Sequence, residues 1–149
     1  SSTAPISREG QPKWQVPSGW QEISGGQFLV AKFLLTGDAG VQAAVNVSAS
    51  AGDGGGLASN VNRWRRQIGL SEQSEADISK QATSVELSGG KGTQVDMTGT
   101  DPKTAQATRV VGIMVPQTGQ TFFYKLAGEA RLVTAQKEAF EKFVQSAKY

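Results

Sequence analysis

The sequence predicts an α+β fold, in which an antiparallel β-sheet carries helices packed on it. Two observations lead to this class. Strand-like segments with alternating or continuous apolar residues are mostly joined by tight turns, and tight turns connect antiparallel neighbours. Two other segments repeat apolar residues at helical spacing. The expected order is β-β-α-β-β-β-β-α, which places helices against an antiparallel sheet.

The length of 149 residues indicates one domain. A chain of this size buries about 68–70% of the surface that it exposes when unfolded. The apolar fraction of 38% is modest, but the apolar residues are clustered and periodic, which argues against disorder. Residues 1–13, beginning SSTAPISREGQ, are expected to form a flexible leader, and residues 14–149 a single folded domain. A signal peptide or lipid anchor upstream of Ser1 would lie outside this sequence.

Composition excludes several kinds of chemistry. The sequence contains neither cysteine nor histidine, so disulfides, thiolate zinc sites, cysteine nucleophiles and histidine-based triads are excluded. No metal or organic cofactor is expected, because the carboxylates are scattered. A membrane-spanning helix needs about 18 consecutive apolar residues, and no such run is present. The net charge of +2 gives no reason to expect a nucleic-acid partner.

The N-terminal part contains a turn and two strands. The sequence Pro17-Ser18-Gly19, between two tryptophans, predicts a tight turn. Residues 27–36 (QFLVAKFLLT) are apolar on both alternating faces apart from Lys32, so this strand is expected to be covered on both sides. A turn at 37–40 leads into 41–50, where apolar and mainly small or polar residues alternate. This pattern predicts a half-buried strand that forms a hairpin with the first.

A glycine-rich loop and a helix follow. Residues 52–56 form the loop, and a helical pattern begins at Leu57 and ends near Gly69. The sequence Ser74-Glu75-Ala76-Asp77 fits a capping box and predicts one further helical turn.

Four strands and a last helix are expected in the second half. The strands are 81–87, 94–98, 107–115 and 121–127, with turns at 88–92 and 116–119. The helix runs from about 129 to 148, and its stripe comprises Leu132, Val133, Gln136, Ala139, Phe140, Phe143, Val144 and Ala147.

The segment LASNVNRWRRQIG (57–69) is the least ordinary in the chain. On a helical wheel its apolar stripe contains Trp64, and Asn60 and Gln67 border that stripe on one side. In one interpretation Trp64 anchors the helix to the sheet, while Asn60 and Gln67 hydrogen-bond nearby backbone such as the glycine-rich loop. In this interpretation the motif is structural.

In the alternative interpretation the polar side of this helix contacts a partner. Arg63, Arg66, Arg65 and Asn62 lie outside the apolar stripe. Guanidinium groups bind carboxylates and phosphates through forked hydrogen bonds, so an acidic partner could dock here. Arg63 and Arg66 lie within roughly 60° of each other on the wheel.

Three other patterns do not support a catalytic or ligand-binding role. Ser88-Gly89-Gly90-Lys91-Gly92-Thr93 lacks the serine or threonine after lysine that a phosphate loop requires, and a hairpin turn is expected there. Asp96 and Asp101 lack a third acidic neighbour at metal-ligand spacing. Glu86 and Asp96 are expected to face each other across a hairpin, but nothing marks them as a general acid and base.

Four strings taken together resemble bacterial relatives of the PsbP/Mog-like family. They are P-S-G-W at 17–20, N-V-N-R-W-R-R-Q-I-G at 60–69, T-F-F-Y-K-L-A-G at 121–128 and F-E-K-F-V-Q-S at 140–146. The resemblance extends from Trp14 to the end of the chain. It implies an α/β/α sandwich around an antiparallel sheet and offers no catalytic residues to carry over. Members of the family are generally non-catalytic: PsbP is an extrinsic subunit of photosystem II, the Mog branch binds a small GTPase, and many bacterial relatives are predicted lipoproteins.

The resemblance leads to three functional hypotheses. The first is a non-catalytic module facing the bacterial cell envelope, periplasmic or lipid-anchored, that docks onto a larger membrane-protein assembly. The second is a lipoprotein that holds a small ligand in a cleft between the sheet and a helix. The third is an enzyme, which the missing histidine and cysteine disfavour.

Overall fold

The computed structural model describes residues 12–149. Residues 1–11 of the predicted leader lie outside the described residues. The rest of that leader belongs to the fold, because the backbone of Lys13 exchanges two hydrogen bonds with that of Lys148, at 2.9 and 2.8 Å. The leader prediction was therefore wrong for Lys13, which is paired with the C-terminal end.

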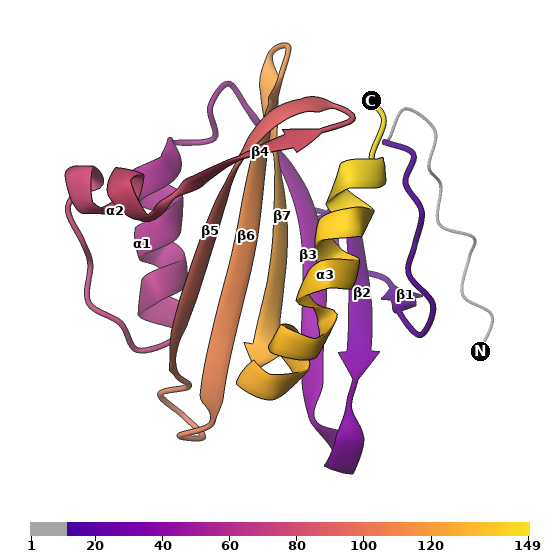
Figure 1. The fold of residues 1–149 in the computed structure, drawn as a ribbon, viewed down its shortest axis with the longest axis vertical. Helices are drawn as coiled ribbons and strands as arrows, with labels where there is room; N and C mark the ends of the chain where they lie inside the picture. Colours follow the sequence, from indigo (N-terminus) through magenta and orange to yellow (C-terminus); the bar gives the residue numbers. More distant parts are fainter. Residues whose placement is uncertain (1–11) are drawn as a thin grey trace.

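The core of the molecule is one seven-stranded sheet with the order β1-β2-β3-β7-β6-β5-β4, and every neighbouring pair is antiparallel (Figure 1). The α+β prediction is confirmed. The strands are β1 (Gln21–Ile23), β2 (Ala31–Thr36), β3 (Gln42–Ala51), β4 (Thr83–Leu87), β5 (Gly90–Thr100), β6 (Ala107–Gln117) and β7 (Gln120–Glu129). The helices are η1 (Asp38–Gly40), α1 (Leu57–Gln67), α2 (Glu75–Gln81) and α3 (Ala130–Ser146).

Helices lie on both sides of this sheet. In Figure 1, α3 crosses in front of the sheet, and α1 and α2 lie together beside β5. Beneath α3, an aromatic core joins Phe33, Tyr124, Phe140 and Phe143, all of them almost fully buried. Beneath α1, a second core contains Val61, Trp64, Ile68, Ile78, Val95, Met97, Val110, Met114 and Phe123. We call these the α3 core and the α1 core.

The segment predicted to be covered on both faces, 27–36, is covered on only one face, and other strands are covered on both. At β2 only Phe33 and its alternate neighbours are buried, and no β2 residue belongs to the α1 core. β6 and β7 are the strands with helices on both faces: on β6, Val111 faces the α3 core and Val110 the α1 core. The prediction for 27–36 was wrong because α1 is short and packs on β5, β6 and β7. β2 also begins only at Ala31, and Phe28 before it is 83% exposed.

The other differences are local. β1 had not been predicted. The turn expected at 88–92 is two residues long, and β5 begins at Gly90. Glu86 consequently pairs with Lys91, and Asp96 is opposite Val111, so the expected facing of Glu86 and Asp96 was wrong. The predicted cap of α2 is confirmed: Ser74 Oγ accepts the N–H of Asp77 at 3.2 Å. The helix itself has seven residues, where one turn was expected.

Among the described residues, none of the helices has the length and apolar character that crossing a bilayer requires.

Candidate functional site: a groove at the start of helix α1

Trp64 fixes α1 to the sheet. Its side chain is 2% exposed, and its ring lies directly over Gly112 of β6. A Cβ at position 112 would collide with that ring, so only glycine allows the helix to approach so closely. Trp64 is thus buried between α1 and the sheet, on the stripe where the helical wheel places it.

Asn60 connects α1 to the loop before it. The amide is 2% exposed, and its Nδ2 donates to the carbonyl oxygens of Gly54 at 3.0 Å and Gly56 at 2.7 Å. This is the predicted contact with the glycine-rich loop. Gln67 differs from the prediction, because its Oε1 accepts a hydrogen bond from the Lys125 side chain at 3.1 Å instead of bonding backbone.

The glycine-rich loop folds back onto β7. Gly54 adopts a positive φ and lies so close to the ring of Phe123 that an added Cβ would overlap it. Two bonds tie the loop to the β6–β7 hairpin: Gly52 N–H donates to Gly119 O at 3.0 Å, and Thr121 Oγ1 donates to Gly52 O at 2.8 Å. The loop is therefore held at both ends, by Asn60 and by the hairpin.

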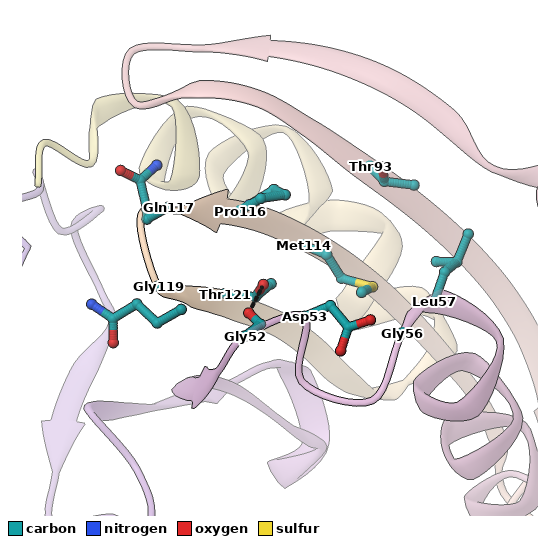
Figure 2. A pocket seen from close by; sticks show the side chains of 11 residues that line it. Gly52, Asp53, Gly56, Leu57, Thr93, Met114, Pro116, Gln117, Gly119 and Thr121 are labelled. Carbon is teal, nitrogen blue, oxygen red and sulfur yellow. Dashed lines mark hydrogen bonds between the residues drawn. The ribbon is translucent and has the colours of Figure 1, made fainter.

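An open groove of about 420 Å³ lies between this loop, the start of α1 and the ends of β5, β6 and β7. Figure 2 shows Asp53 on the loop side, with Met114 and Pro116 on the strand side. Leu57 and Met114 give the groove an apolar wall, with Thr93 from the neighbouring strand. The complete lining is Gly52, Asp53, Gly56, Leu57, Thr93, Met114, Pro116, Gln117, Gly119, Gln120 and Thr121.

Some polar side chains of the groove already bond the protein. Thr121 is bonded to Gly52, and Gln117 Nε2 donates to Gly89 O at 2.8 Å. Asp53 Oδ1 accepts the N–H of Gly55 at 3.0 Å, and its Oδ2 makes no hydrogen bond with the described residues. Asp53 is also the only ionisable residue in the lining, so the groove has an acceptor but no acid–base pair.

A second hollow, of about 510 Å³, lies at the start of α3. One of its two carboxylates, Glu129, accepts the N–H of Leu132 at 2.9 Å and caps the helix. That bond, more than the neighbouring Arg131, holds the pKa of Glu129 below its ordinary value. Glu129 and Arg131 of this hollow pair with each other, whereas Asp38 also lines it. The groove at α1 is the candidate chosen for a ligand, because its wall is mainly apolar.

The predicted arginine surface is divided by the structure. Asn62 exchanges two hydrogen bonds with the backbone of Gln73, at 2.9 and 3.0 Å, and Arg65 Nε donates to Ser71 O at 2.7 Å. Arg66 forms an exposed ion pair with Glu72 at 2.8 Å. These contacts hold the segment after α1 against the helix. Arg63 is exposed and has no ion pair or hydrogen bond with any described residue.

Asp96 and Asp101, which the sequence does not favour as metal ligands, both have partners within the fold. Asp96 forms a two-pronged ion pair with Arg109, which also donates to Thr134 of α3 at 2.9 Å. Asp101 accepts backbone N–H groups of Lys103 and Thr104 in its own turn. Residues 12–149 contain no cluster of three or more acidic side chains that could hold a metal ion.

The groove was not located by sequence reasoning. Its walls come from three separate parts of the chain, 52–57, Thr93 and 114–121, and only the sheet register brings them together. The signal that the sequence offered was the run Gly54-Gly55-Gly56 immediately before a helix, because glycine readily adopts a positive φ.

Solved structures show the same fold. No protein-family model and no curated protein matches the sequence. A protein of Bacteroides thetaiotaomicron VPI-5482 superposes with a TM-score of 0.58 and 14% identity, over 96% of this chain and 46% of that one. LpqN of Mycobacterium tuberculosis, which is involved in cell envelope biogenesis, superposes with a TM-score of 0.54 and 14% identity, over 93% and 82%. The chain thus spans less than half the length of the Bacteroides protein. At 14% identity, both likenesses show that the fold is shared and nothing further.

Proposed function

We propose that this chain is a non-catalytic binding module of the bacterial cell envelope, and that it holds a small, largely apolar ligand in the groove at the start of α1. The observation that carries the proposal is the groove itself. Its volume of about 420 Å³ is typical of small-molecule sites. Its wall is apolar at Leu57, Met114 and Pro116, and Asp53 supplies one polar contact. The fold shared with LpqN supports the envelope location.

The groove chemistry favours binding over catalysis. Acid–base and nucleophilic mechanisms need at least two reactive groups within hydrogen-bond reach of each other. Asp53 has no such partner among the lining residues. A ligand with an apolar body and one hydroxyl or amine donor fits best, because the body would cover Met114 and the donor would reach Asp53 Oδ2.

The test uses Nile red, a neutral apolar dye, as the probe. Thr93→Phe places a ring in the groove, whereas Thr98→Phe adds the same ring to the exposed side of the same strand. We expect fluorescence titration to show dye binding to the parent chain and to Thr98→Phe, and loss of binding in Thr93→Phe. The proposal fails if the parent chain does not bind the dye, or if Thr93→Phe binds as well as the parent.

Docking onto a larger membrane-protein assembly is the second candidate function. The observation that favours it is Phe28, which is 83% exposed in the loop between β1 and β2. Aromatic side chains are enriched at protein interfaces. A lipid anchor upstream of Ser1 and membership of the PsbP/Mog-like family belong to this second candidate.

A further inference from the structure

A row of polar residues crosses the half of the sheet that α1 leaves open. In the strand register Lys32 of β2 is opposite Asn46 of β3, and Asn46 is opposite Lys125 of β7. Directly opposed residues lie on the same face, with Cβ atoms about 4.5–5.5 Å apart. Asn46 is therefore flanked on both sides by lysine stems.

Helix α1 brings a third cation to this row. Arg63 and Gln67 are four residues apart on the helix edge that faces the open half, and residues at this spacing are neighbours. Lys125 Nζ donates to Gln67 Oε1 at 3.1 Å and lies 6.0 Å from the centre of the Trp64 ring. Lys125 is thus held against α1, on the side where Arg63 is exposed.

This cluster lacks an acidic partner. Lys32, Arg63 and Lys125 form no ion pair with any described residue, although Arg66 and Arg109 do. The side chains that β2, β3 and the middle of β7 place on this face include no carboxylate. They are Lys32, Leu34, Thr36, Gln42, Ala44, Asn46, Ser48, Ser50, Phe123, Lys125 and Ala127.

Two observations show that this row of residues is energetically unfavourable on its own: its charges repel one another, and one of its polar atoms lacks a partner. Desolvation, and then the positive charges of Arg63 and Lys32, lower the pKa of Lys125 from its ordinary value. Asn46 Oδ1 is enclosed without a hydrogen-bond partner. An enclosed amide oxygen without a partner carries a free-energy cost that folded proteins rarely leave uncompensated. A bound anion would offset the repulsion among Lys125, Arg63 and Lys32. The Asn46 oxygen is an acceptor, which a phosphate, itself an acceptor, does not satisfy.

We propose that Lys125, Lys32 and Arg63 bind a phosphate group above Asn46, at a site separate from the groove. Three cations suit a dianion, because two lysines supply point charges and arginine supplies a fork that matches phosphate oxygens. The amide nitrogens of Asn46 and Gln67 are available as neutral donors. A soluble phosphate and the headgroup of a phospholipid share this chemistry.

The phosphate site goes beyond the proposed function and does not depend on it. Phe123 lies between the two sites, two residues before Lys125 on the same face of β7. The glycine-rich loop covers this ring through Gly54. A ligand in the groove and a phosphate at Lys125 therefore occupy different places along β7.

The first test is calorimetric titration with inorganic phosphate at constant ionic strength. We expect Lys125→Gln and Arg63→Gln each to weaken binding about tenfold, the effect of losing one charge-assisted hydrogen bond. Arg66→Gln is the matched control, because Arg66 lies on the same helix, is similarly exposed and already pairs with Glu72. Equal losses in Arg63→Gln and Arg66→Gln would show only a bulk charge effect and would overturn the site.

The second test separates binding from folding. In phosphate-free buffer Lys125→Gln should melt at the same temperature as the parent chain or higher, because a repelled charge has been removed. Phosphate should raise the melting temperature of the parent chain and leave that of Lys125→Gln unchanged. An equal rise in both proteins contradicts the proposal, and so does equal protection by acetate.

The third test distinguishes the two sources of phosphate. Vesicles of phosphatidylcholine alone are compared with vesicles that also contain phosphatidic acid. Flotation of the parent chain, but not of Lys125→Gln, with the acidic vesicles assigns a lipid headgroup. Calorimetric binding of phosphate without flotation assigns a soluble ligand. If neither inorganic phosphate nor the acidic vesicles bind, the proposal is wrong.

Discussion

The two faces of the sheet are used differently. The face under α3 is closed, with Phe33, Tyr124 and Phe143 at most 1% exposed. The face under α1 is covered only over β5, β6 and β7, and β2 and β3 present half-buried polar side chains such as Lys32 and Asn46 beside the helix. The α3 face supplies the larger core and therefore most of the stability. Both proposed binding sites lie at the borders of α1, on the other face.

The largest expected effect tests whether α1 is anchored as firmly as α3. Trp64→Ala should lower the free energy of unfolding by about 3–5 kcal/mol, since it removes a buried aromatic side chain and leaves a cavity. Urea unfolding measures this loss, with Phe143→Ala in the α3 core as the comparison. A loss below about 1 kcal/mol for Trp64→Ala would mean that the α1 face is held by other contacts.

A smaller effect is expected at Gly112 of β6, a strand that α1 and α3 both cover. Gly112→Ala should destabilise the protein by about 1–3 kcal/mol, because the added methyl group overlaps the Trp64 ring. In the Trp64→Ala background the same change should be nearly neutral, since the space is then open. Equal costs in both backgrounds would show that Gly112 is needed for a reason other than the helix contact.

The smallest stability effect is expected on the exposed side of α1. Arg63→Glu combined with Arg66→Glu should change stability by less than about 1 kcal/mol, because exposed ion pairs such as Arg66–Glu72 contribute little. If α1 docks onto an envelope partner, the double variant should lose co-purification with it, while Lys142→Glu on α3 retains it. Unfolding of the double variant would place these arginines in the fold, and unchanged co-purification would move the binding face elsewhere.

Much of the fold was predictable because its signals are local. The alternation at 41–50, the helical spacing at 57–69 and the last helix all lie within single elements. β1 escaped prediction because its three residues, QEI, are too few to show a period. The extent of β2 was overestimated, because Leu29 N–H bonds back to Gly26 O in a turn that the apolar pattern does not reveal.

The sites were less predictable because they depend on contacts between distant segments. Asn60 and Trp64 were assigned correctly from one helical wheel. The helix face does not reveal that Asn62 and Arg65 bond the backbone of 71–73, and these contacts remove two residues from the predicted partner surface. Lys125 stands out in sequence as a charge within TFFYKLA, but its partners become visible only through the register of β2, β3 and β7.

The pairing of β3 with β7 has a consequence for how the chain folds. Within residues 12–149 every other strand pair joins neighbours along the chain, whereas this one brings Ala51 to Gln120 across all of α1, α2, β4, β5 and β6. Long-range pairing of this kind forms slowly, because the entropy of closing a long loop is lost before the stabilising contacts form. The apolar face of β3 and β7 is covered by α3, whose 17 residues follow β7 in the chain. The chain therefore cannot complete its aromatic core until α3, which follows all seven strands, has been synthesised.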